Sequence, residues 1–179
     1  MKKEFGLLMG MRKVILFLAV LFLTACDSNE IRYDGKLLKI AVIGEIPELE
    51  NEKIQLEGLF LNQFREDTLN VAQNYDAIMV TPDSFEAASD DIYVDSYQNA
   101  EMPIIFFNSS KRHYPFVNGG LTYETSHFDS LDNGSHTTIY LNNINEDKND
   151  AWFFYSDNQK NLNELYKEVF QKVEALSLK

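Results

Sequence analysis

Six polar or glycine residues that could form a ligand site follow three short apolar runs of the sequence. They are Gly44, Thr81, Asn108, Ser109, Lys111 and Arg112. The runs span residues 37–43, 77–80 and 102–107, and each is typical of a buried strand. The carboxyl ends of parallel strands meet at one edge of a sheet, where ligands of α/β proteins usually bind. The spacing therefore predicts one ligand site at this edge.

The chemistry of these residues suits a small polar or anionic ligand. Lys111 and Arg112 are adjacent cations in an otherwise acidic sequence, while hydroxyl and amide groups supply hydrogen bonds. Glu45 and Asp83 could face the same crevice as a pair of carboxylates. Ordinary turn chemistry with solvated side chains explains the same residues, and Asp83 is also suited to the first turn of a helix.

Other motifs give no support for a cofactor, a metal or a catalytic residue. The loop after Gly44, "GEIPELEN", lacks the glycine patterns that bind dinucleotides or nucleoside triphosphates. The stretch "HFDSLDNGSH" places His127, Asp129, Asp132 and His136 close together, but their spacing matches no standard metal motif. The aromatic residues of the segment 113–136 either bind a protein partner or cover the sheet.

The only cysteine, Cys26, stands directly after a signal-like segment. Basic residues precede ten consecutive apolar residues at 14–23, and "LTAC" follows at 23–26. The apolar run is too short to span a bilayer, and the arrangement is typical of a secretory signal peptide. "LTAC" resembles the lipobox of bacterial lipoproteins. The resemblance implies that Cys26 is lipidated and becomes the mature N-terminus after Sec-type export to the outer face of the plasma membrane.

The resemblance divides the chain into three parts. We expect a signal peptide at residues 1–25, a lipidated tether at 26–36 and a single domain at 37–179. Translation is expected to start at Met11, which gives a compact signal. After cleavage the chain has twelve basic and twenty-seven acidic side chains, a formal charge of −15. Such a surface disfavours nucleic acid as a partner, and without free thiols the domain must fold on its hydrophobic core alone.

The pattern of the mature sequence predicts a three-layer α/β domain with a mixed sheet. Strands at 37–44, 77–81 and 102–108 alternate with helices at 50–66 and 82–97, which indicates a parallel βαβαβ first half. Thr81 is suited to cap the second helix. An antiparallel hairpin, with strands at 137–141 and 152–155 joined by a long polar loop, follows. A C-terminal helix at 159–176 carries an apolar stripe.

These observations favour a membrane-anchored lipoprotein whose small, non-catalytic domain binds a polar or anionic ligand, or an envelope protein. The alternative is an extracytoplasmic hydrolase with its site at the strand ends. A purely structural envelope protein is a third hypothesis. Asp27, directly after Cys26, resembles the inner-membrane retention signal of enteric lipoproteins.

Overall fold

The computed structural model describes residues 32–127, 134–143, 148–156 and 161–177. These residues belong to one compact unit that spans Ile31–Lys179. Cys26 and the predicted signal peptide lie outside the described residues. Among the described residues, no helix has the length and apolar character needed to cross a membrane.

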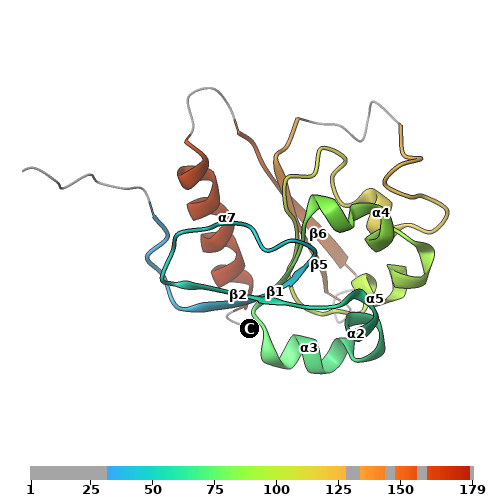
Figure 1. Ribbon diagram of the computed structural model, residues 1–179, viewed down its shortest axis with the longest axis horizontal. Coiled ribbons are helices and arrows are strands. Elements are labelled where there is room, and N and C mark those ends of the chain that lie inside the picture. The colour runs from blue at the N-terminus through green and yellow to red at the C-terminus, as the bar shows by residue number, and fades with distance from the viewer. Residues whose placement is uncertain (1–31, 128–133, 144–147, 157–160, 178–179) are drawn as a thin grey trace, which may run out of the picture. The chain divides into compact units, whose positions relative to one another are not determined.

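The fold is a six-stranded mixed sheet with helices on both faces (Figure 1). The strands are β1 (Leu38–Ile43), β2 (Ile54–Gly58), β3 (Ala77–Val80), β4 (Ile104–Phe106), β5 (Thr137–Asn143) and β6 (Lys148–Phe154). The helices are α2 (Leu61–Glu66), α3 (Thr68–Asn74), α4 (Phe85–Ala88), α5 (Val94–Gln98), α6 (Tyr114–Val117) and α7 (Leu162–Ser177), with 3-10 turns at Pro82–Ser84 and Asp91–Tyr93.

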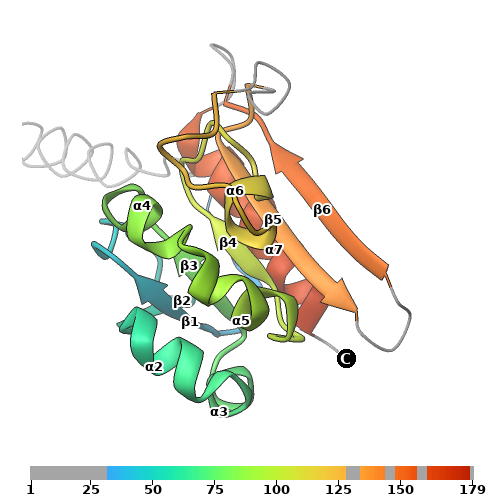
Figure 2. The same cartoon turned by 90° about the vertical axis from the view of Figure 1, so that its right-hand side faces the viewer.

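The spatial order of the strands is β2-β1-β3-β4-β5-β6. The first four are parallel, and β5 and β6 add an antiparallel hairpin to the edge formed by β4 (Figure 2). The predicted α/β class with a mixed sheet is therefore confirmed. Because β1, β3 and β4 are central, nearly all their side chains are buried, as expected for parallel strands covered on both sides.

Two apolar clusters hold the three layers together. One cluster joins alternate strand residues such as Ile43 and Phe106 to Phe64 of α2 and Tyr97 of α5. On the opposite face, the other joins Ile40 and its neighbours to the stripe of α7. That stripe is buried at Leu165, Val169, Phe170 and Val173, which confirms the predicted packing of the C-terminal helix on the sheet.

The prediction of a helix at 50–66 is wrong for the first half of that segment. Residues Ile54–Gly58 form β2, which pairs in parallel with β1, and the first helix begins only at Leu61. Ile54 and Leu56 pack on the α7 side of the sheet, which matches the two-residue period of a strand. The segment between β3 and β4 is likewise broken into α4 and α5, joined by a turn at Ser89–Asp90.

The predicted tether is too long at its domain end. Tyr33 is only 3% exposed and packs edge-on against Phe170 of α7, with their ring centroids 6.0 Å apart. Its hydroxyl lies 2.8 Å from Glu174 Oε2, and Asn51 Nδ2 donates a 3.0 Å hydrogen bond to its carbonyl oxygen. Tyr33 to Lys36 therefore belong to the domain.

Candidate functional site

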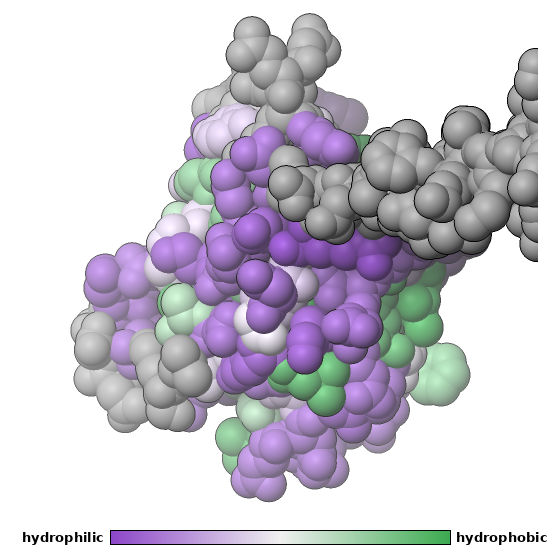
Figure 3. Space-filling model, turned by 90° about the vertical axis from the view of Figure 1, so that its left-hand side faces the viewer, coloured by the Kyte–Doolittle hydropathy of each residue, from purple (hydrophilic) through white to green (hydrophobic). Residues whose placement is uncertain are grey.

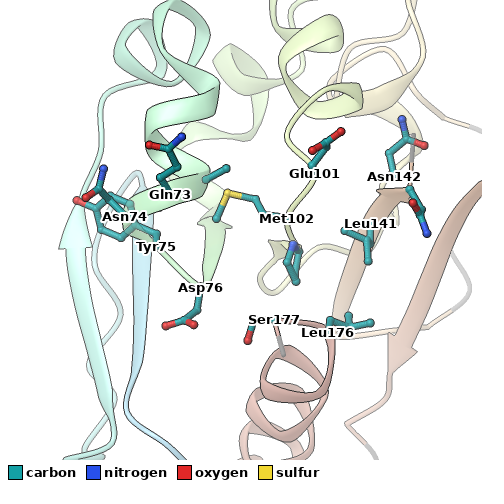
Figure 4. A pocket seen from close by; sticks show the side chains of 13 residues that line it. Gln73, Asn74, Tyr75, Asp76, Glu101, Met102, Leu141, Asn142, Leu176 and Ser177 are labelled. Atoms are coloured by element: carbon teal, nitrogen blue, oxygen red, sulfur yellow. The ribbon is translucent and has the colours of Figure 1, made fainter. Parts of the chain in front are cut away.

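A cavity of about 540 Å³ lies at the edge of the sheet where the parallel strands β3 and β4 begin. Its walls come from the end of α3, the loop before β4, the end of β5 and the end of α7. We call it the amino-edge cavity, and its lining is Ala72, Gln73, Asn74, Tyr75, Asp76, Glu101, Met102, Pro103, Leu141, Asn142, Asn143, Leu176 and Ser177. Figure 4 shows Met102 between the two sides of this hollow.

Amide and carboxylate groups surround the mouth of the amino-edge cavity. Asp76 is held in place by Lys36, whose Nζ lies 3.2 Å from Oδ1, and by the backbone N–H of Lys39. Asn142 donates through Nδ2 to the carbonyl oxygen of Gln98 at 2.6 Å, which leaves its Oδ1 as an acceptor. Glu101 is exposed and has a left-handed backbone with φ of 49°. The lining therefore offers several fixed hydrogen-bond acceptors.

Tyr75 forms an ordered wall of the same cavity. Its hydroxyl donates to Glu57 Oε2 at 3.0 Å, and Lys39 Nζ lies 4.7 Å above its ring. Burial, followed by the hydrogen bond and the charge of Glu57, raises the pKa of Tyr75 above its ordinary value. This side chain therefore stays neutral and fixed at physiological pH.

A second, more open cavity of about 620 Å³ lies at the opposite edge, beyond the carboxyl ends of β1 and β2. Gly44, Glu45, Asp83, Phe60 and Tyr93 are among its lining residues. Asp83 Oδ1 accepts the backbone N–H of Glu45 at 2.9 Å and the hydroxyl of a buried threonine. Burial alone would raise the pKa of Asp83, but these hydrogen bonds lower it. Asp83 thus closes the turn between two neighbouring strands.

No protein-family model, curated protein or solved structure matches this chain.

Of the six residues predicted for a single strand-end site, only Gly44 lines the second cavity. Thr81 is 2% exposed, and its hydroxyl bonds to Ile43 O and to Asp83 instead of capping a helix. Gly44 has φ of 108°, and a Cβ there would collide with the hydroxyl of Thr81. Gly44 and Thr81 therefore meet where the neighbouring strands β1 and β3 end, as expected. They form a packed turn there, in which the Thr81 hydroxyl is already hydrogen-bonded.

The other predicted residues gather in the loop after β4. Ser109 is buried, and its hydroxyl donates to Arg112 O at 3.3 Å. The amine of Lys111 is bound by Tyr123, over whose ring it lies at 4.6 Å and whose carbonyl oxygen it contacts. Asn108 and Arg112 both have left-handed backbones, with φ of 55° and 57°. The amine of Lys111 is thus bound within the same chain, by Tyr123, and does not point toward the other predicted site residues.

The three histidines do not form one site in the part of the chain that is described. His113 is buried between the rings of Tyr114 and Tyr140, and His136 contacts the hydroxyl of Thr137 through Nδ1 at 2.9 Å. His127 is exposed, while Asp129 and Asp132 lie outside the described residues. Among the residues that are described, no three histidine, cysteine, aspartate or glutamate side chains come close enough to hold a metal ion.

Sequence reasoning missed the amino-edge cavity, because its walls come from four segments far apart in the chain. No single stretch of the sequence carries its signature. The dipeptides Asn74-Tyr75 and Asn142-Asn143 look like ordinary strand and helix ends until the sheet order brings them together. The left-handed backbone of Glu101 is a further indication of function, since it costs conformational energy and such residues are concentrated at functional sites, but only the structure shows it.

Proposed function

We propose that this protein is a lipid-anchored binding protein of the bacterial cell envelope, which holds a small polar ligand in the amino-edge cavity. The observation that supports this proposal is the cavity itself. Its volume of about 540 Å³ falls within the range of small-molecule sites. It combines an apolar floor, which includes Met102 and Leu141, with polar groups around the mouth (Figure 4).

The lining favours a ligand rich in hydrogen-bond donors. The charged side chains of the described lining, Asp76 and Glu101, are acidic, and Gln73, Asn74 and Asn142 supply amide oxygens. Carboxylates accept hydrogen bonds only, whereas hydroxyl and amino groups donate them. A polyol, a sugar or a small amine therefore fits better at this edge than the anion expected for the strand ends.

The proposed anchor would keep this cavity near the membrane. Tyr33 is fixed to Glu174 near the end of α7, and the same end of α7 supplies Leu176 and Ser177 to the cavity. Only seven peptide steps separate Cys26 from Tyr33, so the link reaches at most about 25 Å when fully extended. The face of the domain shown in Figure 3 is largely hydrophilic, with a few apolar areas, which suits an aqueous layer next to the bilayer.

The anchor is tested with the full-length chain in a bacterial host. Mature protein should begin at Cys26, carry the mass of its acyl chains and partition into detergent. A Cys26→Ser variant should lose all three properties. A variant that stays membrane-bound and is cleaved at the same bond would contradict the lipoprotein proposal.

The ligand is tested independently with purified mature protein and a panel of sugars, polyols and amines in a thermal-shift assay. A ligand that binds the folded state raises the melting temperature. Met102→Trp should fill the cavity and abolish the shift, while Glu101→Gln should weaken it. Glu48→Gln, an exposed glutamate outside the lining, is the matched control. A shift that survives Met102→Trp would place the ligand elsewhere.

A further inference from the structure

The loop that follows β4 holds its backbone in an uncommon conformation. Asn108 and Arg112 have φ of 55° and 57°, in the left-handed region that favours glycine. The hydroxyl of Ser109 closes the loop between them by donating to Arg112 O. Strained non-glycine residues persist where the surroundings force them, and they are concentrated at binding and catalytic sites. Two such residues within five positions make this loop a candidate site of its own.

Three buried polar atoms near this loop have no hydrogen-bond partner among the described residues. They are Arg112 Nε, His113 Nδ1 and Thr138 Oγ1. Thr138 is fully buried and His113 is 8% exposed. The large majority of buried side-chain polar atoms in proteins are hydrogen-bonded, to protein or to ordered water. Three unpaired atoms in one place therefore indicate a missing partner.

The three residues that carry these atoms lie near one aromatic ring, that of Phe153 in β6. Arg112 Cζ lies 5.2 Å from the centroid of this ring, and the ring of His113 lies 6.3 Å from it. Thr138 is the direct partner of Phe153 in the β5–β6 register. His113 also stacks on Tyr140, which is two positions along β5 from Thr138 and thus on the same face. The three residues therefore share surroundings that are largely apolar and include the rings of Tyr140 and Phe153.

The chemistry of these atoms specifies an acceptor with negative charge. The Nε–H of arginine can only donate, a threonine hydroxyl can donate, and a neutral imidazole carries one N–H. Arg112 has no carboxylate partner within the described residues, in a mature chain with a formal charge of −15. An arginine that uses Nε together with one terminal nitrogen presents two parallel N–H groups, which match the two oxygens of a carboxylate.

We propose that Arg112, His113 and Thr138 form a binding site for the carboxylate group of a small organic acid. The Arg112 side chain as a whole is only partly buried, although its Nε is covered, so a ligand that approaches from solvent meets the exposed part of the guanidinium first. Nε–H and a terminal N–H of Arg112 hold its two oxygens, and the Thr138 hydroxyl donates to the inner oxygen. The surrounding rings of Tyr140 and Phe153 lower the local polarity, which strengthens these hydrogen bonds. This site is separate from the amino-edge cavity and does not depend on the function proposed for it.

The test uses mature protein labelled with ¹⁵N and titrated with sodium acetate, with sodium chloride and acetamide as controls at matched ionic strength. Acetate should shift the Nε–H resonance of Arg112 in a saturable manner, while chloride and acetamide should not. Arg112→Gln should weaken acetate binding about tenfold or more, because it removes a charge-assisted pair of hydrogen bonds. Arg65→Gln is the matched control, since Arg65 also lies over an aromatic ring, that of Tyr93, but far along the chain.

Thr138→Val separates binding from stability. Valine has nearly the same shape and removes only an unpaired hydroxyl, so melting without ligand should be unchanged or improved. Acetate binding should weaken several-fold. Thr137→Val should instead lower the melting temperature, because its hydroxyl is bonded to His136 Nδ1 at 2.9 Å. Acetate affinity that is equal in the wild-type, Arg112→Gln and Thr138→Val proteins would overturn the proposal, as would a Nε–H resonance that moves equally with chloride.

Discussion

Acidification should destabilise this domain between pH 6.5 and pH 4, with His113 as the main contributor and His136, whose pKa burial also lowers, acting in the same direction. The imidazole of His113 is 8% exposed and lies between the rings of Tyr114 and Tyr140, at centroid distances of 4.6 and 5.2 Å. Burial, and then the charge of the adjacent Arg112, lowers the pKa of His113 from 6.5 to about 4. The folded protein therefore holds this histidine in its neutral form.

The direction in which the stability of the fold changes with pH follows from the number of protons that the folded and unfolded states bind. Below pH 6.5 the unfolded chain takes up a proton at this histidine, while the folded chain does not until the pH approaches 4. Stability is thus complete above pH 6.5 and falls as the pH decreases. A difference of about 2.5 pKa units corresponds to about 3 kcal/mol. Small domains are typically stable by about 5–15 kcal/mol, so the loss is large.

Urea denaturation of the mature protein at pH 7.5, 6.5, 5.5 and 4.5 measures this loss directly. His113→Phe preserves the ring stack but cannot titrate, so between pH 7.5 and pH 4.5 its free energy of unfolding should change by about 2.5 kcal/mol less than that of the wild type. His127→Gln removes an exposed histidine and should leave the pH dependence unchanged. If His113→Phe and the wild type lose stability in parallel, the histidine is not buried as described.

Three further substitutions, two of them with a matched control, test the packing of the domain. Phe170→Ala should cost about 3–5 kcal/mol in urea denaturation because the ring is 2% exposed, whereas Leu162→Ala, on a 45% exposed side chain, should cost less than about 1 kcal/mol. Gly44→Ala should lower the free energy of unfolding by about 2 kcal/mol or more in the same assay, because φ is positive there and the added Cβ would collide with Thr81. Gly58→Ala, whose added Cβ meets no neighbouring atom, should be nearly neutral. Tyr33→Ala should lower the melting temperature and increase proteolysis before β1, and unchanged cleavage there would show that this residue is not docked.

The arrangement of layers was predictable because most elements follow simple patterns. Continuous apolar runs gave the central strands, and a 3.6-residue period gave α7. Strand β2 was mistaken for part of a helix because most of the apolar residues between 50 and 66 fall at helical spacing. Pairing with β1 overrides this local preference. The β5–β6 hairpin is also longer than predicted, since polar residues such as Asn142 and Asn149 continue the ladder.

The candidate sites were harder to predict than the fold. The sequence indicated that the loop after β4 was unusual, through the basic pair Lys111-Arg112, but it could not show that Lys111 turns toward Tyr123. Nor could it show that Thr138 is unpaired, because hydrogen bonding depends on atoms brought together by the whole fold. The amino-edge cavity depends on the strand order, which local patterns do not specify.

The docking of Tyr33 determines how the domain responds to a pull on its N-terminal segment. Tension would first act on the Tyr33 contacts with Phe170 and Glu174, and would then pass into β1. Strand β1 lies inside the sheet, with hydrogen bonds to β2 on one side and β3 on the other. To extract it, both ladders would have to break together, whereas an edge strand could be peeled away one bond at a time. A pull on this segment would therefore act on a mechanically resistant part of the fold.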